Sequence, residues 1–109
     1  MGSTGEKRAV KFLKKKGFKI LKTNYETPLG EIDIIAEDNG TIVFIEVKTR
    51  TSDKFGLPSE AVDRRKQEKY YKIATFYLQR ENKMERECRF DVVEVENEKI
   101  NHIFNAFGV

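Results

Sequence analysis

Two segments that read as neighbouring β-strands carry acidic side chains where a buried strand normally carries apolar ones. They span residues 30–36 and 41–48 and are joined by Asn39-Gly40. Asn-Gly between two apolar, β-branched runs predicts a hairpin with a type I′ turn, because both residues accept the positive φ that this turn requires. With these two residues at the centre of the turn, Asp33 is expected opposite Glu46.

The same register places four polar groups on one face of the hairpin. Side chains alternate between faces along a strand, so Glu31, Asp33, Glu46 and Lys48 should project together. The other face is expected to hold the apolar side chains Ile32, Ile34, Val43, Ile45 and Val47. Like charges directly opposed across a hairpin are destabilising. A divalent cation would compensate the repulsion between Asp33 and Glu46, so the pattern predicts metal-ion chemistry, with Lys48 relieving part of the charge.

Length and composition restrict the class of protein. The 109 residues, 39% of them hydrophobic, predict a single domain (1–109) with one modest core. A lone cysteine, Cys88, cannot form an internal disulfide and suits a reducing cytoplasm. No apolar stretch has the length of a membrane span, and neither a Walker loop nor a Gly-x-Gly-x-x-Gly motif is present, so neither a membrane nor a nucleotide cofactor is implied.

Basic residues are concentrated near the N-terminus. Residues 1–22 carry eight Lys and Arg side chains against one acid, Glu6, although the net charge of the whole chain is only +3. Such clustering is typical of proteins that bind nucleic-acid phosphates, although a solvated helix face explains it equally well. The candidate phosphate-binding residues are Lys14, Lys15, Lys16, Arg50, Arg64 and Arg65.

The remaining elements are read from periodicity and turn residues. The sequence predicts a helix over residues 5–16 ended by Gly17, a strand over 18–21, a connection over 24–29 and a loop over 51–57 that could close over a substrate. A long helix follows over 58–80, and two strands over 89–95 and 99–107 close the chain. Ser3 and Glu6 have the spacing of a capping box, which gives Glu6 a structural alternative to any chemical role.

Lys66 lies on the apolar stripe of the long helix, four residues from both Val62 and Tyr70. It either points into the acidic site or packs its aliphatic stem while its ammonium stays in water. His102, the only histidine, is better explained by strand packing than by a zinc site or a catalytic triad. The aromatic residues of the long helix, Tyr70 among them, fit core packing better than base stacking.

The predicted order α-β-β-β-α-β-β implies an α/β fold: a mixed central sheet of about five strands flanked by helices, because a long helix can return the chain to a parallel strand. Asp33 followed by Glu46-Val47-Lys48 resembles the Asp…Glu-x-Lys signature of the PD-(D/E)xK, restriction-endonuclease-like nucleases. The wider chain resembles the YraN-like bacterial family, which is similar to archaeal Holliday-junction resolvases. The segments that carry this second resemblance are Gly5-Glu6, residues 30–33, residues 44–50, Lys66, Arg89-Phe90-Asp91 and residues 105–107.

The resemblance implies a restriction-endonuclease-like fold and a set of site residues. Asp33, Glu46 and the Val47 carbonyl would bind Mg²⁺, or Mn²⁺ in its place, with Glu6 as a further acid from the first helix. Such a site hydrolyses phosphodiesters, with Lys48 orienting the attacking water or stabilising the transition state. Lys66 is a further catalytic candidate. Glu31 and Gln67 are weaker candidates, since Glu31 can be explained by pairing with Lys48, and Gln67 with Tyr71 is similar to a Gln-x-x-x-Tyr element of related exonucleases.

Two functions follow from these expectations. The first is a Mg²⁺-dependent DNA endonuclease acting on branched or structured DNA in repair or recombination, with a homodimer needed to cut two strands of a junction. The second is a nucleic-acid-binding module that keeps the nuclease scaffold with little or no hydrolysis. Intact Asp33, Glu46 and Lys48 favour the enzyme.

Overall fold

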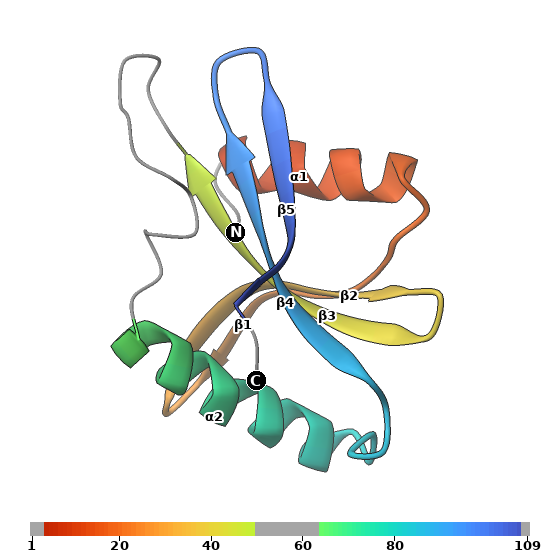
Figure 1. Cartoon of the computed structure of the whole chain (residues 1–109), viewed down its shortest axis with the longest axis vertical. Helices are drawn as coiled ribbons and strands as arrows, with labels where there is room; N and C mark the ends of the chain where they lie inside the picture. The colour runs from red at the N-terminus through yellow and green to blue at the C-terminus, as the bar shows by residue number, and fades with distance from the viewer. Residues whose placement is uncertain (1–3, 50–63, 108–109) are drawn as a thin grey trace.

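Helices and strands follow one another in the order that the sequence predicts (Figure 1). The computed structural model describes residues 4–49 and 64–107. The elements in this part of the chain are α1 (Thr4–Lys15), β1 (Lys19–Thr27), β2 (Gly30–Asp38), β3 (Thr41–Thr49), α2 (Arg64–Arg80), β4 (Cys88–Val95) and β5 (Ile100–Phe107). The α/β class and the order α-β-β-β-α-β-β are therefore confirmed, and the arrangement is consistent with a restriction-endonuclease-like fold.

The strands form one sheet in sequential order, β1-β2-β3-β4-β5. The β2–β3 hairpin has the predicted register, with Asp38 opposite Thr41 and Ile34 opposite Ile45. Asn39 and Gly40 have φ values of 51° and 90°, as a type I′ turn requires. Only β3 and β4 pair in parallel within this sheet, and α2 lies in the crossover between them, as expected.

Each face of the sheet is covered by one helix (Figure 1). Ile73 and Tyr77 of α2 pack with Phe44 on one face, whereas Ala9 and Leu13 of α1 pack with Ile45 on the other. The alternation of apolar side chains along β3 supplies both layers, because successive residues point to opposite faces. The sheet is therefore buried on both sides, and the two hydrophobic clusters hold the strands that carry the acids.

The first strand is longer than predicted. The sequence predicts a strand that ends at residue 21 and a connection over 24–29, but β1 continues to Thr27. Asn24 takes a left-handed conformation inside the strand, with φ of 50°, so a residue that reads as a turn former is accommodated without ending the strand. The predicted loop 51–57, Arg50, Ser3 and the first residues of the helix predicted over 58–80 lie outside the described residues.

Alternation along β2 breaks at Asp33. Ile34 packs on the α1 face, as predicted, but Ile32 packs in the cluster covered by α2, so its predicted face is wrong. On β1, Thr23 pairs with Ile34 and Tyr25 with Ile32. Asn24, with its positive φ, lies between those two pairs and opposite Asp33. This irregularity turns the strand at the residue that bears the first acid of the motif.

Candidate functional site

The site lies where β2 and β3 separate. Their ladder runs from the turn to the Ile34–Ile45 pair, while β2 remains paired with β1 to Gly30 and β3 with β4 to Thr49. In Figure 1 the two strands diverge beyond their shared hairpin. At this fork the Val47 N–H donates a 2.8 Å hydrogen bond to Oδ2 of Asp33. A carboxylate thus takes the place that a strand carbonyl would have in a continuous ladder.

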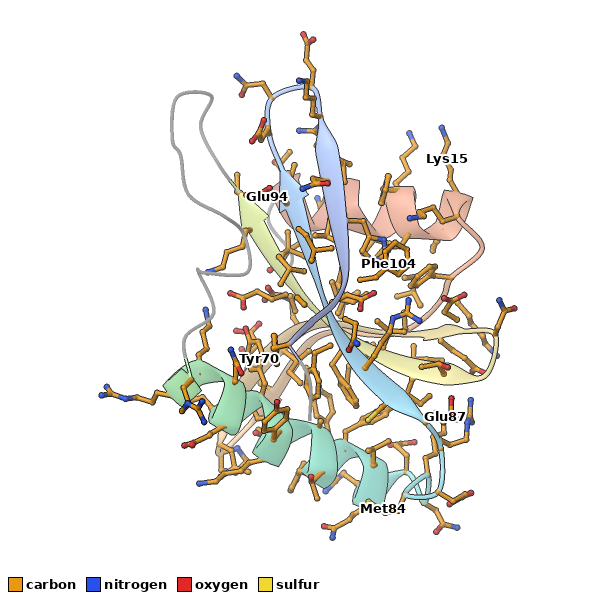
Figure 2. The ribbon with its side chains drawn as sticks, viewed as in Figure 1. Lys15, Tyr70, Met84, Glu87, Glu94 and Phe104 are labelled. Carbon is orange, nitrogen blue, oxygen red and sulfur yellow. The ribbon has the colours of Figure 1, made fainter. Side chains whose placement is uncertain are left out.

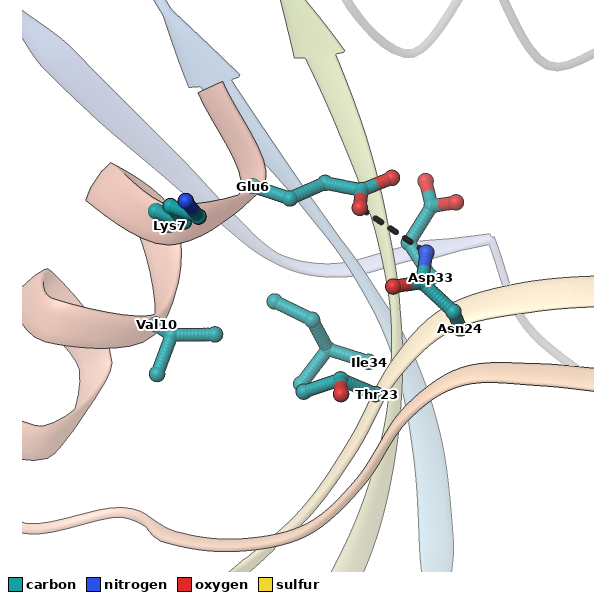
Figure 3. A pocket seen from close by; sticks show the side chains of 7 residues that line it. All are labelled: Glu6, Lys7, Val10, Thr23, Asn24, Asp33 and Ile34. Carbon is teal, nitrogen blue, oxygen red and sulfur yellow. Dashed lines mark hydrogen bonds between the residues drawn. The ribbon is translucent and has the colours of Figure 1, made fainter. Parts of the chain in front are cut away.

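Asp33 lines two cavities, one toward each helix. The cavity toward α1 has a volume of about 570 Å³ and is also lined by Glu6 and Asn24 (Figure 3). The cavity toward α2 has a volume of about 460 Å³ and is also lined by Glu46 and Lys66. Both cavities therefore open onto the same carboxylate.

The electrostatic surroundings of Asp33 disfavour its charged form. The pKa of its carboxyl is raised from 3.8 to about 6. Burial is the largest cause, the nearby carboxylates of Glu6, Glu46 and Glu31 add to it, and the hydrogen bond from the Val47 N–H opposes them. The repulsion between acids that the hairpin register predicts is therefore present. Carboxyl groups with a strongly raised pKa that line a cavity are often functional, which makes Asp33 a candidate site residue.

Glu46 is almost fully buried, at 5% exposure, and two lysines bind one of its oxygens. Lys48 Nζ lies 3.0 Å and Lys66 Nζ lies 2.6 Å from Oε2. Its other oxygen, Oε1, is buried and has no hydrogen-bond partner within the described part of the chain. A buried carboxylate oxygen without a partner costs free energy, so this atom indicates a ligand-binding position.

Lys66 points into the site, so of the two orientations left open by the sequence the structure shows the first. Burial lowers the pKa of its ammonium, but the hydrogen bond to Glu46 and the negative charges of Glu46 and Asp33 together outweigh burial and hold the pKa above its ordinary value. Lys66 Nζ also lies 5.9 Å from the ring centroid of Tyr70, which lines the same cavity. Burial and the Glu46 carboxylate both raise the pKa of the Tyr70 hydroxyl.

Gly30 lets α2 approach the strand that carries Asp33. It begins β2 with φ of 141°, and a Cβ at this position would come within 3.0 Å of Lys69 Cδ and 3.1 Å of Ile73 Cδ1. A side chain here would displace these two side chains and strain the backbone. Gly30 therefore permits the close packing of α2 on the strand that carries Asp33.

Glu6 is directed from α1 toward the same fork (Figure 3). Asn24 Nδ2 donates a 2.8 Å hydrogen bond to Glu6 Oε1 and is 3.2 Å from Glu31 Oε2. Asn24 therefore holds two of the acids that surround Asp33. The predicted pairing of Glu31 with Lys48 is replaced by this bond, because Lys48 binds Glu46 instead.

No three acidic, histidine or cysteine side chains among the described residues converge closely enough to form a ready metal-binding group. The donor chemistry nevertheless fits a hard divalent cation, because carboxylates crowd Asp33 and Glu46 Oε1 has no partner. Lys48 and Lys66 now neutralise Glu46, so a cation at Oε1 would share this carboxylate with them.

Comparison with known proteins assigns the family. The sequence model of "Uncharacterised protein family UPF0102" matches residues 5–95, which include Glu6, Asp33, Glu46 and Lys66. The chain belongs to the UPF0102 family. The YraN-like family that it resembles is this same family, so that resemblance is confirmed.

Curated UPF0102 proteins match over nearly their whole length. One from Caldanaerobacter subterraneus subsp. tengcongensis is 53% identical over 114 residues, covering 98% of this chain and 93% of the relative. One from Thermodesulfovibrio yellowstonii is 51% identical, covering 98% and 95%, and one from Persephonella marina is 45% identical, covering 99% and 93%. Their names give the family and no activity.

The other candidate residues of this UPF0102 chain are dispersed. Arg65 lines the cavity that holds Glu46, and Arg64 is exposed in the first described turn of α2. Gln67 follows Lys66 on α2 and is half-buried, while Tyr71 packs against Phe90, with ring centroids 5.2 Å apart. Lys14, Lys15 and Lys16 are exposed at the far end of α1 from Glu6. The predicted phosphate-binding residues therefore fall into two groups.

Three polar residues near the site are not predicted from the sequence. Its patterns place Asn24 in a connection and Tyr70 in the core. Glu94 of β4 is directly opposite Lys48 in the parallel ladder and is only 6% exposed. Alternation along β4 puts Glu94 on the same face as Val92, so an acid at a buried position of a strand is the signal that could have indicated it.

Among the described residues, no helix is both long enough and apolar enough to cross a bilayer.

Proposed function

We propose that this UPF0102 protein is a metal-dependent endonuclease that hydrolyses phosphodiester bonds in branched or structured DNA. The observation that carries the proposal is the pair of adjacent acids at the fork. Asp33 is held in a repulsive, partly buried environment, and Glu46 is buried with Oε1 unpartnered among the described residues. Such an arrangement is unfavourable in the isolated protein, and a bound cation with a phosphate would relieve it.

Asp33, Glu46 Oε1 and the Val47 carbonyl would hold the metal, with Glu6 as an additional acid from α1. Bound Mg²⁺, or Mn²⁺ as a substitute, supplies a Lewis acid for the scissile phosphate and lowers the pKa of a coordinated water. The Val47 N–H bond fixes the Asp33 carboxylate, and Asn24 fixes Glu6. The protein thus orients its acids through hydrogen bonds made in advance of substrate binding.

Cationic side chains around the acids would bind and stabilise the phosphate. Lys48 lies 3.0 Å from Glu46, in a position to orient the attacking water or to stabilise charge on the phosphate in the transition state. Lys66 and Arg65 line the same cavity from α2 and would bind non-bridging oxygens of the substrate. We expect the protein to act in the cytoplasm, in keeping with its lone cysteine, and cleavage of both strands of a junction would require a homodimer with two such sites.

Cleavage of labelled four-way junction, flap, single-stranded and duplex DNA with Mg²⁺ or Mn²⁺ tests the proposal. Glu46→Gln and Lys48→Met should lose cleavage by at least about a hundredfold while retaining the fold and the affinity for DNA. Glu37→Gln is the matched control, because Glu37 lies on the same hairpin but binds Arg86 at 2.8 Å, away from the fork. Its cleavage should equal that of the wild-type protein.

A second function is supported by the two lysines on Glu46. Because Lys48 and Lys66 already neutralise this carboxylate, the scaffold could bind nucleic acid without a metal. Salt-sensitive DNA binding, with neither cleavage nor Mn²⁺ binding detected by calorimetry, would refute the endonuclease and favour this binding module. Unchanged cleavage by Glu46→Gln would refute the assignment of the site.

A further inference from the structure

The basic end of α1 is not part of the acidic site. Lys14 and Lys15 occupy its last turn, whereas Glu6 lies in its first, and nine residues of helix separate Glu6 from Lys15 by about 13 Å. Figure 2 shows Lys15 at the end of α1 and Tyr70 on α2, the two helices that cover opposite faces of the sheet. A cluster of cations at this end therefore needs an explanation other than binding of the scissile phosphate.

An exposed aromatic ring lies beside this basic end. Phe104 of β5 is 50% exposed, and its ring stacks on His102, with centroids 3.9 Å apart and an interplanar angle of 19°. Lys16 Nζ lies 4.5 Å and Arg89 Cζ lies 5.1 Å from the centroid of Phe104. An imidazole thus stacks on the ring and two cations lie over it, while half of the side chain stays exposed.

The support beneath Phe104 is fixed by a buried network. The His102 side chain is 3% exposed, and its Nε2 lies 2.8 Å from Oδ2 of Asp91, which is fully buried. Its Nδ1 lies 3.1 Å from Lys16 Nζ, which can only donate, so the tautomer with its proton on Nε2 satisfies both bonds. The Arg89 Nε–H donates to Asp91 Oδ1 at 3.0 Å.

This network offsets the charge of two acids near the ring. Arg89 pairs with both Asp91 and Asp38, the latter at 3.1 Å, and the neutral His102 donates to Asp91. Lys16, which donates to His102, supplies the second positive charge, so the group as a whole carries no net negative charge. Lys14 and Lys15 remain exposed next in sequence to Lys16. A half-exposed aromatic ring that is held in place and already contacts cations matches a nucleobase with its flanking phosphates better than it matches an apolar peptide, which would gain nothing from the lysines.

We propose that Phe104 is a stacking platform for an unpaired nucleobase, with the flanking phosphates bound by Lys14, Lys15 and Lys16. The inference deepens the proposed function, on which it rests for the class of ligand, by adding single-stranded segments to the substrate. A base paired within a duplex has both faces covered by its neighbours, whereas an unpaired base can place one face on the ring. Branched DNA with unpaired nucleotides would then bind at two separate places on the protein.

The chain contains no tryptophan, so Phe104→Trp introduces a single fluorescent reporter at the platform. The probe is oligo-dT, compared with an abasic oligomer of equal length that carries the same phosphates and no bases. Measurements in EDTA on the Glu46→Gln background prevent cleavage. Met84→Trp is the matched control, because Met84 is 53% exposed and lies in the connection after α2, apart from Phe104 (Figure 2).

We expect oligo-dT to quench the fluorescence of the Phe104→Trp variant strongly, the abasic oligomer to quench it little, and the Met84→Trp variant to respond to neither. Phe104→Ala should weaken oligo-dT binding about tenfold and leave duplex binding unchanged. Replacing the three lysines by glutamine should reduce the slope of log K against log salt by up to about 0.7 for each single-strand phosphate that is no longer neutralised.

Equal quenching by both oligomers, or quenching in the Met84→Trp protein, would overturn the platform. The absence of any response would also overturn it, and would favour an acidic protein partner at this surface. These readouts are independent of hydrolysis. Stacking without cleavage would therefore refute only the endonuclease, whereas cleavage without stacking would refute only the platform.

Discussion

Replacing Asp33 by asparagine should stabilise the metal-free protein at neutral pH. The Asp33 carboxyl is partly buried and faces the carboxylates of Glu6, Glu46 and Glu31, so its charged form is disfavoured. An asparagine side chain at this position would remove the charge and keep an oxygen that can accept the 2.8 Å bond from the Val47 N–H. The substitution therefore removes the electrostatic cost of the carboxylate but keeps the hydrogen bond between residue 33 and the Val47 N–H.

The size and sign of this effect follow from the pKa of Asp33. A rise from 3.8 to about 6 corresponds to about 3 kcal/mol, at 1.36 kcal/mol for each pKa unit, and partial solvent exposure reduces the expected value to about 2 kcal/mol. Between pH 3.8 and 6 the folded state binds more protons than the unfolded state, so the stability of the wild-type protein falls as pH rises through this window. The cost is fully present above about pH 6 and absent below about pH 4.

Urea unfolding of both proteins in EDTA, from pH 4 to pH 8, measures the difference in free energy of unfolding. The advantage of Asp33→Asn should be about 2 kcal/mol at about pH 7.5 and should vanish near pH 4. Mg²⁺ at the higher pH should stabilise the wild-type protein more than the variant, since only the former keeps the full set of acids. Asp38→Asn, which loses a partner of Arg89, is the control and should gain no stability at any pH. An advantage independent of pH, or a loss of stability at the higher pH, would refute the electrostatic account.

Two further perturbations test separate parts of the molecule. Lys66→Met should bind Mg²⁺ about tenfold more tightly by calorimetry, because the positive charge of Lys66 at Glu46 Oε2 repels a cation at Oε1. Lys69→Met, a change at another residue that lines the same cavity, should bind Mg²⁺ as the wild-type protein does, and equal affinities for all three proteins would contradict this repulsion. Asp91→Ala should lower the free energy of unfolding by about 3–5 kcal/mol, because Arg89 and His102 lose a fully buried partner, and a loss below about 1 kcal/mol in urea titrations would contradict this.

The hairpin could be predicted because its signals are local. Asn39-Gly40 fixes the turn, the turn fixes the register, and the register brings Asp33 and Glu46 to the same region. Periodicity also placed Lys66 on the stripe that faces the sheet, although the choice between the site and solvent needed the structure. Each of these inferences uses residues of a single helix or of two consecutive strands.

The fork and the buried network could not be predicted in the same way. Strict alternation places Ile32 and Ile34 on the same face of the sheet. In the structure they lie on opposite faces, next to an irregularity at Asn24 of the neighbouring strand, which has a left-handed conformation. A residue that tolerates positive φ is usually read as a turn, and only the paired strand shows that it is not. Lys16 and His102 are 86 residues apart, so no local pattern joins them.

The fork explains how charged groups from both layers of an α/β sandwich can act on one carboxylate. Glu6 belongs to α1 and Lys66 to α2, on opposite faces of the sheet, yet the charges of both interact with Asp33. A continuous sheet would separate these side chains by its own thickness and by the ladder between β2 and β3. Because the ladder ends at the Ile34–Ile45 pair, Asp33 is open to both cavities.

The opening between β2 and β3 costs free energy, since acids are buried beside an incomplete ladder, and the apolar clusters on the two faces of the sheet must offset this cost. A functional site is therefore expected where acidic residues break the local strand pattern, and Glu46 Oε1, which has no partner among the described residues, lies at that position.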